Sequence, residues 1–260
     1  MIEVFSAHEG SSPLLISVPH DGCHIPPDIM RRMTAAGRAI PDTDWHVAEL
    51  YSFARDLGAH FLVANYSRYV VDLNRSPADE NLYPGQVATG LCPTQTFAGE
   101  EIYAEGGVSD REKAARIENY WQPYHDQLVA MLAAIRDQYG YALLWDAHSI
   151  PSRVPRLFDG VLPELNVGTN AGDSCATGIE SAVVAAAEVS EYSSVVNERF
   201  KGGFITRHYG RPADGVQALQ LEIAQRAYMD EESGVFDAAK ASDLRVTLER
   251  MLRAVIDAAG

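Results

Sequence analysis

Two apolar runs in this sequence end where polar side chains gather. Asn74 and Arg75 directly follow one run, whereas Asp146 and His148 directly follow another. Arg donates two parallel hydrogen bonds to a carboxylate, and His and Asp are common metal ligands. A third, largely apolar run, residues 217–223, contains one acid, Glu222, which could serve as a base. These residue types together indicate a metal-dependent hydrolase that acts on a small acidic substrate.

A catalytic zinc ion commonly takes three protein ligands from His, Asp and Glu and leaves one position for water. His20, which follows the apolar run 14–18, and His148 form the best pair of imidazoles. Several acids compete for the third place, and spacing alone does not choose among Asp21, Asp42, Asp44 and Asp146. Three further groups are interpreted as surface or loop residues: His24, Asp42 and His46.

Glu222 has two interpretations. An unpaired carboxylate among apolar residues is costly to ionise, so its pKa rises and it becomes a candidate general base. The alternative is a structural Glu in the core that pairs with a neighbour such as Arg226.

Arginine is frequent in the segments expected at strand ends and in loops, and such residues are often solvated or engaged in structural ion pairs. The six of interest are Arg68, Arg75, Arg153, Arg156, Arg207 and Arg211. The glycine-rich run 201–212, which contains Arg207 and His208, is interpreted as one wall of an anion site.

The elements that position these residues follow from hydrophobic periodicity. Strands are predicted at 14–18, 61–64, 69–73, 141–145, 194–197 and 215–223. Helices are predicted from Asp44 to Gly58, around 121–135, and at 171–189 and 235–259. This alternation predicts an α/β fold in one domain, residues 1–260, with a mixed, mostly parallel sheet flanked by helices. Ligands gather at the carboxyl ends of such strands. The region 76–109 is expected to be a functional loop or lid.

Composition excludes several classes of protein. The net charge of −15, from 36 acids and 21 bases, argues against nucleic acid as a partner. No apolar run is long enough to span a membrane, and the N-terminus lacks the features of a secretory signal. Three cysteines without CxxC spacing indicate free thiols. We therefore expect a cytoplasmic protein, and the sequence leaves its oligomeric state open.

Several long stretches of the sequence resemble the N-formylglutamate amidohydrolase family, the deformylases of histidine breakdown. They are SVPHDGCHIP at 17–26, DTDWHVAELY at 42–51, SRYVVDLNRSP at 67–77, LLWDAHSIPS at 143–152, RLFDG at 156–160, FKGGFITRHYGRP from 200 and ALQLEIAQRAYM ending at 229. The resemblance covers nearly the whole chain. It implies hydrolysis of N-formyl-L-glutamate to formate and L-glutamate, and a fold similar to that of zinc carboxypeptidases.

The resemblance also implies roles for individual residues. His20, Asp44 and His148 would bind a divalent metal, most simply Zn²⁺, and Glu222 would act as the base. Arg75 with Asn74 would bind one carboxylate of the substrate. Arg207 or Arg68 would meet the other carboxylate or stabilise the developing oxyanion, with His208 assisting. The carboxypeptidase pattern places a Glu ligand where this chain has Cys23, and the resemblance to deformylases implies Asp44 as the third ligand instead.

Two other functions remain open on the sequence. A metallocarboxypeptidase or another N-acyl amino acid hydrolase would use the same metal, base and arginine, and would differ in the size of its pocket. A non-catalytic protein that binds acidic metabolites would use the polar residues for recognition alone.

Overall fold

A computed structural model describes residues 2–80 and 89–260. Within them the chain forms a seven-stranded sheet in the order β1-β3-β2-β4-β7-β5-β6 and a small ribbon of β8 and β9. β1 and β3 are antiparallel, as are β5 and β7, and the other neighbours in the sheet are parallel. The strands are β1 Phe5–His8, β2 Leu14–Val18, β3 His60–Ala64, β4 Ala142–Ile150, β5 Leu165–Gly168, β6 Ser194–Val196, β7 Val216–Ala224, β8 Met229–Asp230 and β9 Val235–Phe236. The predicted fold class, with its mixed and mostly parallel sheet, is confirmed.

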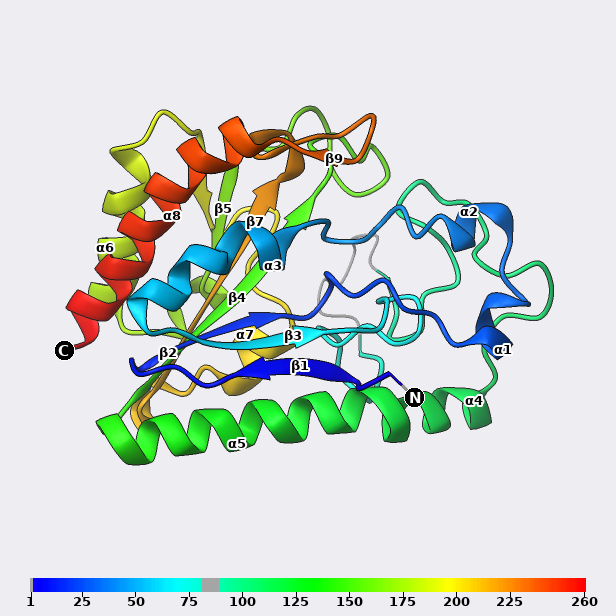
Figure 1. Cartoon of the computed structure of the whole chain (residues 1–260), viewed down its shortest axis with the longest axis horizontal. Coiled ribbons are helices and arrows are strands. Elements are labelled where there is room, and N and C mark those ends of the chain that lie inside the picture. Colours follow the sequence, from blue (N-terminus) through cyan, green and yellow to red (C-terminus); the bar gives the residue numbers. More distant parts are fainter. Residues whose placement is uncertain (1, 81–88) are drawn as a thin grey trace.

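Helices cover both faces of the sheet (Figure 1). The α-helices are α1 Pro27–Met30, α2 Ala35–Arg38, α3 Val47–Leu50, α4 Asp110–Arg116, α5 Gln122–Tyr139, α6 Thr177–Glu188, α7 Phe204–Tyr209 and α8 Ala238–Ala259. A 3₁₀ helix, η1 (Tyr51–Leu57), continues α3, and a π-helical turn, η2 (Ile117–Trp121), joins α4 to α5. Short 3₁₀ turns lie at η3 Asn170–Gly172, η4 Pro212–Asp214 and η5 Gln225–Ala227.

Each face of the sheet has its own hydrophobic core because side chains alternate along a strand. On one face, Leu143 and Trp145 of β4 pack with residues of α3, η1, α6 and α8. On the other face, Leu144 of β4 and Ala218 of β7 pack against the apolar side of α5 and against Ile205 of α7. The long helices α6 and α8 on the first face contact each other extensively. These two cores hold the central strands β2, β4 and β7 rigidly.

The strand predicted at 69–73 is wrong. This segment is buried, contains turns and is not a strand of the sheet, although Val71 and Leu73 pack in the core beside it. The carbonyl groups of Tyr69 and Val70 accept hydrogen bonds from the Arg116 side chain, and the N–H of Asp72 donates to Leu91. A side chain and a distant loop therefore satisfy backbone groups that a strand would pair with its neighbours.

Other predicted boundaries shift. The helix expected from Asp44 is the short α3 followed by η1, the one expected at 171–189 is α6, and the one expected at 235–259 is α8, which begins only at Ala238. Asp237 caps α8 by accepting from the backbone N–H groups of Ala239 and Lys240. Strands β1 and β5 are not anticipated by the sequence. The lid predicted at 76–109 contains residues 81–88, which lie outside the described residues.

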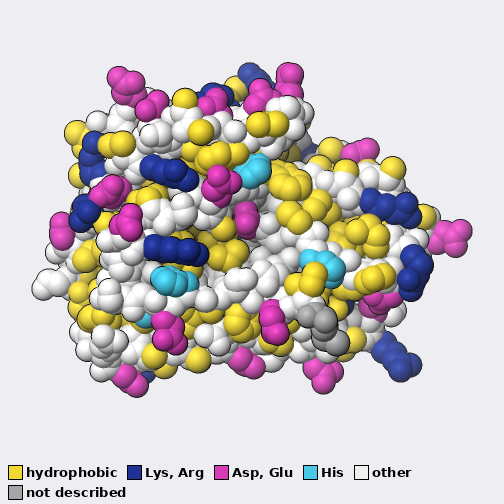
Figure 2. All heavy atoms as spheres, viewed as in Figure 1, with side chains coloured by type: hydrophobic (Ala, Val, Ile, Leu, Met, Phe, Trp, Pro, Cys, Tyr) yellow, Lys and Arg dark blue, Asp and Glu magenta, His cyan; other side chains and the backbone are white. Residues whose placement is uncertain are grey.

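The described residues contain no helix that is both long and apolar enough to cross a membrane. Acidic and basic side chains are interspersed on the face shown in Figure 2, with hydrophobic side chains in small groups between them. The three cysteines are free thiols, as predicted: Cys23 is exposed, and Cys92 and Cys175 are buried.

Candidate metal and active site

One face of β4 and β7 changes from apolar to polar along its length. In β4 the face that begins with Ala142 and Leu144 continues with Asp146 and His148, all buried. In β7 the same face begins with Val216 and Ala218 and continues with Gln220 and Glu222. The parallel register pairs Asp146 with Gln220 and His148 with Glu222. The metal-ligand candidate and the base candidate are therefore neighbours on adjacent strands.

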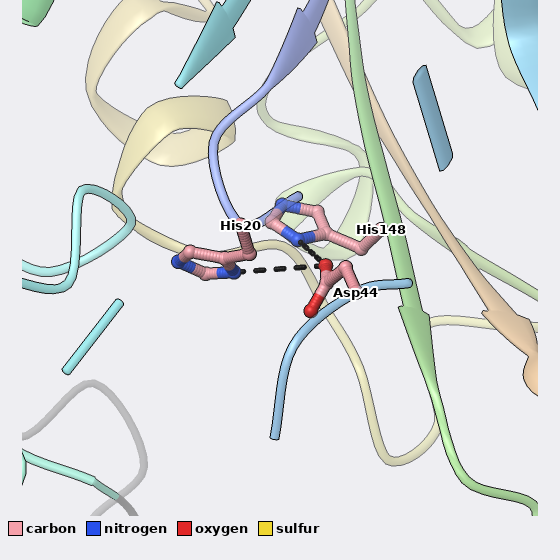
Figure 3. A group of neighbouring side chains, drawn as sticks. All are labelled: His20, Asp44 and His148. Atoms are coloured by element: carbon pink, nitrogen blue, oxygen red, sulfur yellow. Dashed lines mark hydrogen bonds and ion pairs between the residues drawn. The ribbon is translucent and has the colours of Figure 1, made fainter. Parts of the chain in front are cut away.

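Two loops bring the other ligand candidates to this place. His20 follows the end of β2 and Pro19, and the N–H of Asp44 donates to the carbonyl of His20 at 3.1 Å. Figure 3 shows both imidazoles directed at one carboxylate oxygen of Asp44. The Oδ2 atom of Asp44 lies 3.0 Å from Nδ1 of His148 and 3.7 Å from Nδ1 of His20.

The far nitrogen of each imidazole is held by another carboxylate. Nε2 of His20 lies 2.8 Å from Oδ1 of Asp72, and Nε2 of His148 lies 3.0 Å from Oδ2 of Asp146. When Nε2–H donates to the carboxylate, the Nδ1 atom of each ring presents a lone pair towards Asp44. Carboxylate partners of this kind orient metal-binding imidazoles and raise their basicity.

The donor set fits a divalent cation. The buried Nδ1 atom of His20 has no hydrogen-bond partner in the structure. The three candidate ligand atoms lie within 4.8 Å of one another. Two ligand atoms of a tetrahedral zinc ion lie roughly 3.4 Å apart, since each is about 2.1 Å from the metal. The observed separations of 3.0 and 3.7 Å fall on either side of this value. Lone pairs that face a carboxylate require a proton or a cation between them.

The electrostatics of this cluster follow from burial and charge. Burial alone would raise the pKa of Asp44, but His20 and His148 hold it below its usual value. Burial alone would lower the pKa of His148, but Asp146 and Asp44 hold it well above its usual value. The site therefore favours negative carboxylates around a positive centre.

Glu222 lines the same cavity as His20, Asp44 and His148. Its burial raises the pKa of the carboxyl group to about 8, although the charge of His148 opposes the shift. The alternative prediction, that Glu222 pairs with Arg226, is wrong, because Arg226 forms an ion pair with Glu164 at 2.6 Å. A buried acid with a raised pKa beside a candidate metal site is well placed for general acid–base chemistry.

Arg68 also lines the cavity, and it is engaged by acids. Its Nη2 donates to Oδ2 of Asp72 at 2.7 Å, and its Nη1 lies 3.5 Å from Oδ1 of Asp44. Its guanidinium lies over the ring of Phe97, 4.9 Å from the centroid. Arg68 thus links the carboxylate behind His20 to Asp44.

The side-chain amide of Asn74 contacts Asp146 and His148. Its Nδ2 donates to Asp146 at 3.1 Å and lies 2.9 Å from Nε2 of His148, while its Oδ1 accepts from the N–H of Ile205. Gly203 is required here, since a Cβ atom at that residue would lie 2.4 Å from Nδ2 of Asn74. The amide of Asn74 therefore holds Asp146, the carboxylate that accepts from Nε2–H of His148.

Arg75 lies at the cavity, whereas Arg207 and His208 are not among the residues that line it. Arg75 donates from Nε to the carbonyl of Thr89 and from Nη1 to that of Asn74. Arg207 is on α7 and donates from Nε to the carbonyl of Gly202, and His208 stacks on Phe204. The structure therefore brings together every predicted site residue except Arg207 and His208.

Sequence reasoning missed Asp72 and Arg199. Asp72 binds both His20 and Arg68, and its one signal was an acid within the apolar run that was read as a strand. Arg199 lines the cavity, but nothing around it in the sequence marks it out. Asp42 lies in a loop as expected, yet it is buried and accepts hydrogen bonds from the Tyr69 hydroxyl at 2.6 Å and the Phe97 N–H at 2.8 Å.

A family model and two relatives that match this chain are all named for N-formylglutamate. The family model described as N-formylglutamate amidohydrolase matches residues 12–229. The chain is 47% identical over 259 residues to a protein named N-formylglutamate deformylase from Pseudomonas putida, with 98% of this chain and 97% of the relative covered. A protein of the same name from Pseudomonas aeruginosa is also 47% identical, with the same coverage.

Two solved structures share the fold. A crystal structure of N-formylglutamate amidohydrolase from Ralstonia eutropha has a TM-score of 0.81 and 26% sequence identity, with 97% of each chain covered. A gene product of Agrobacterium tumefaciens has a TM-score of 0.75 and 18% identity, with 97% of this chain and 96% of that chain covered. The likeness extends through the whole chain in each case.

Proposed function

The chain belongs to the N-formylglutamate amidohydrolase family, and we propose that it hydrolyses N-formyl-L-glutamate to formate and L-glutamate as a metal-dependent enzyme. One observation carries this proposal beyond family membership. His20, Asp44 and His148 converge at a cavity that also contains Glu222 and three arginines, Arg68, Arg75 and Arg199. A metal site, a base and cations for a dicarboxylate are the parts this reaction needs.

We propose that His20, Asp44 and His148 hold Zn²⁺. When bound, a divalent cation of this kind polarises a carbonyl oxygen and lowers the pKa of a water molecule. Asp72 and Asp146, which contact Nε2 of the two imidazoles, would leave the Nδ1 lone pairs available as ligands for the ion.

Glu222 moves the proton in this proposal. As a carboxylate it takes a proton from the attacking water, and the resulting carboxylic acid returns a proton to the departing amino nitrogen of glutamate. Without a cation, burial keeps the pKa of Glu222 at about 8. A cation nearby favours the ionised form, so metal binding brings the pKa towards the working range of a base.

The arginines supply charge complementarity. The protein carries a net charge of −15, so a local group of cations must offset the overall field for an anionic substrate to bind. Arg75 binds a carboxylate of the substrate in this proposal. Arg68, beside Asp44, stabilises the negative charge that develops on the formyl oxygen.

A formate-release assay tests the proposal directly. The Zn²⁺-loaded protein should release formate from N-formyl-L-glutamate, lose this activity on chelation and regain it when Zn²⁺ is restored. N-acetyl-L-glutamate is the matched control, because it adds only a methyl group at the reacting carbon. Equal turnover of the two compounds, or full activity in the presence of chelator, would contradict the proposal.

A further inference from the structure

We propose that Arg199 binds the side-chain carboxylate of the substrate and sets the preference for an acidic side chain, whereas Arg75 binds the α-carboxylate. This assignment rests on the proposed function. It gives each of the two carboxylates of N-formyl-L-glutamate its own arginine, and the two arginines come from different loops. Both residues line the cavity that contains the metal-ligand cluster.

The three arginines that line the cavity have different surroundings. Arg68 is 7% exposed and lies between Asp72, at 2.7 Å, and Asp44, at 3.5 Å. Arg68 is therefore part of the network of contacts that supports the metal-ligand candidates. Arg75 and Arg199 are half-buried at the cavity wall, where an incoming dianion can meet them. A substrate with two carboxylates is matched by two cations at these places.

Arg75 is tied to the segment that supports the metal-ligand candidate His148. Arg75 directly follows Asn74, whose amide contacts His148 at 2.9 Å and Asp146 at 3.1 Å. The Nη1 of Arg75 donates to the carbonyl of Asn74 at 3.0 Å, so its guanidinium is tied to the segment that supports a metal ligand. The α-carboxylate of an N-formyl amino acid is the anionic group nearest to the formyl carbon, and Arg75 is its natural partner.

Arg199 contacts a backbone carbonyl and an aromatic ring at the cavity wall. Its Nε donates to the carbonyl of Leu157 at 2.8 Å, and its guanidinium lies 5.2 Å from the ring centroid of Phe200. Leu157 and Phe200 also line the cavity. Arg199 is thus a cation beside apolar side chains, and this combination suits a substrate side chain whose methylene groups lead to a terminal carboxylate. The backbone contact and the ring fix the plane of the guanidinium and lower the entropy lost on binding.

The test compares two substrates in matched variants. N-formyl-L-glutamine differs from N-formyl-L-glutamate only in a neutral side-chain amide, so it keeps the α-carboxylate and loses the other charge. Arg199→Met should lower kcat/KM for N-formyl-L-glutamate about 100-fold, mainly through KM, and change the value for N-formyl-L-glutamine little. Arg75→Met should lower both values by similar factors. Arg199→Lys should retain part of the preference, and Arg253→Met, on the exposed surface of α8, should retain all of it.

A binding measurement separates this inference from the proposed reaction. Calorimetry would measure the affinity of the Zn²⁺-loaded wild type and of Arg199→Met for L-glutamate and L-glutamine. If the wild type releases no formate but prefers L-glutamate in a manner that Arg199→Met abolishes, the carboxylate site stands and the reaction falls. An Arg199→Met protein that retains the wild-type preference, or that loses both substrates equally, overturns the assignment. A wild type without any preference overturns it as well. Should Arg199→Met fail to fold, Arg199→Lys and Arg199→Gln decide by the same criteria.

Discussion

The two faces of strands β4 and β7 differ sharply, although their residues alternate along the same backbone. One face is mostly apolar and contributes Leu143, Trp145 and Ala147 of β4 and Leu219, Leu221 and Ile223 of β7 to one hydrophobic core. The opposite face is apolar only in its first half and then carries Asp146, His148, Gln220 and Glu222. Alternate residues of the same strands therefore serve different purposes: those on one face pack in the core and stabilise the fold, and those on the other face line the candidate active site. Substitutions on the two faces should therefore fail in different ways.

The largest effect is expected on the polar face, from Glu222→Gln. The amide cannot accept the proton of the attacking water, so kcat should fall on the order of 1,000-fold or more. The metal should remain bound, because Glu222 is outside the ligand cluster. Metal content by atomic spectroscopy and formate release together check this. Full activity in this variant would show that another group acts as the base.

The apolar face should respond in the opposite way to Leu221→Ala. Leu221 is fully buried in the core with α6 and α8, and its truncation should lower the free energy of unfolding by about 2–5 kcal/mol. The folded fraction should keep a nearly unchanged kcat. Denaturant unfolding and kinetics on the same sample measure both quantities. A large loss of kcat without a loss of stability would show that the two faces are not separate.

Arg75→Ala tests a loop residue that lines the cavity beside the polar face. Loss of a charge-assisted hydrogen bond to a carboxylate should raise KM by about 10- to 100-fold and change kcat less. Steady-state kinetics with N-formyl-L-glutamate measure this. An unchanged KM would remove Arg75 from the binding site.

The smallest expected effect is a dependence on pH of the stabilisation that Zn²⁺ gives. Asp146 and Asp44 hold the pKa of His148 well above its usual value in the metal-free protein, although burial opposes this. The stability from protonated His148 is therefore complete below the unfolded value of about 6.5 and is lost as pH rises through the folded pKa. Metal binding requires the neutral ring. The rise in Tm on addition of Zn²⁺ should accordingly be greater at about pH 8 than at about pH 6. Thermal unfolding at both values checks the sign, and a smaller rise at the higher pH would contradict it.

The sequence predicts the polar face better than it predicts the loops around it. His148 and Glu222 are recognisable because each interrupts or follows an apolar run, and such local patterns survive folding. The run 69–73 has the composition of a strand, but Arg116 and Leu91 satisfy its backbone from distant segments. No local pattern reports such partners. The family and its hydrolytic activity, implied by long stretches in order, are confirmed by the comparisons.

The arginines show the same limit. Arg207 lies in a conspicuous glycine-rich run, whereas Arg199 stands in a run without special features, yet Arg199 is the one that lines the cavity. The choice between them depends on how the loop before α7 meets the loop around Leu157, a long-range contact. Arg68 illustrates a different limit, since its partners are acids that the fold brings near it, among them Asp44.

The position of Asp44 has a mechanical consequence. It is held to His20 through its backbone, and it lies just before α3, whose Val47 and Leu50 are part of the core on the apolar face. A cation shared by Asp44, His20 and His148 would act as a reversible crosslink between segments more than a hundred residues apart and would anchor the segment before α3 to the carboxyl end of β4. Removal of the ion should consequently loosen the segment around α3, where amide hydrogen exchange and protease cleavage would increase first.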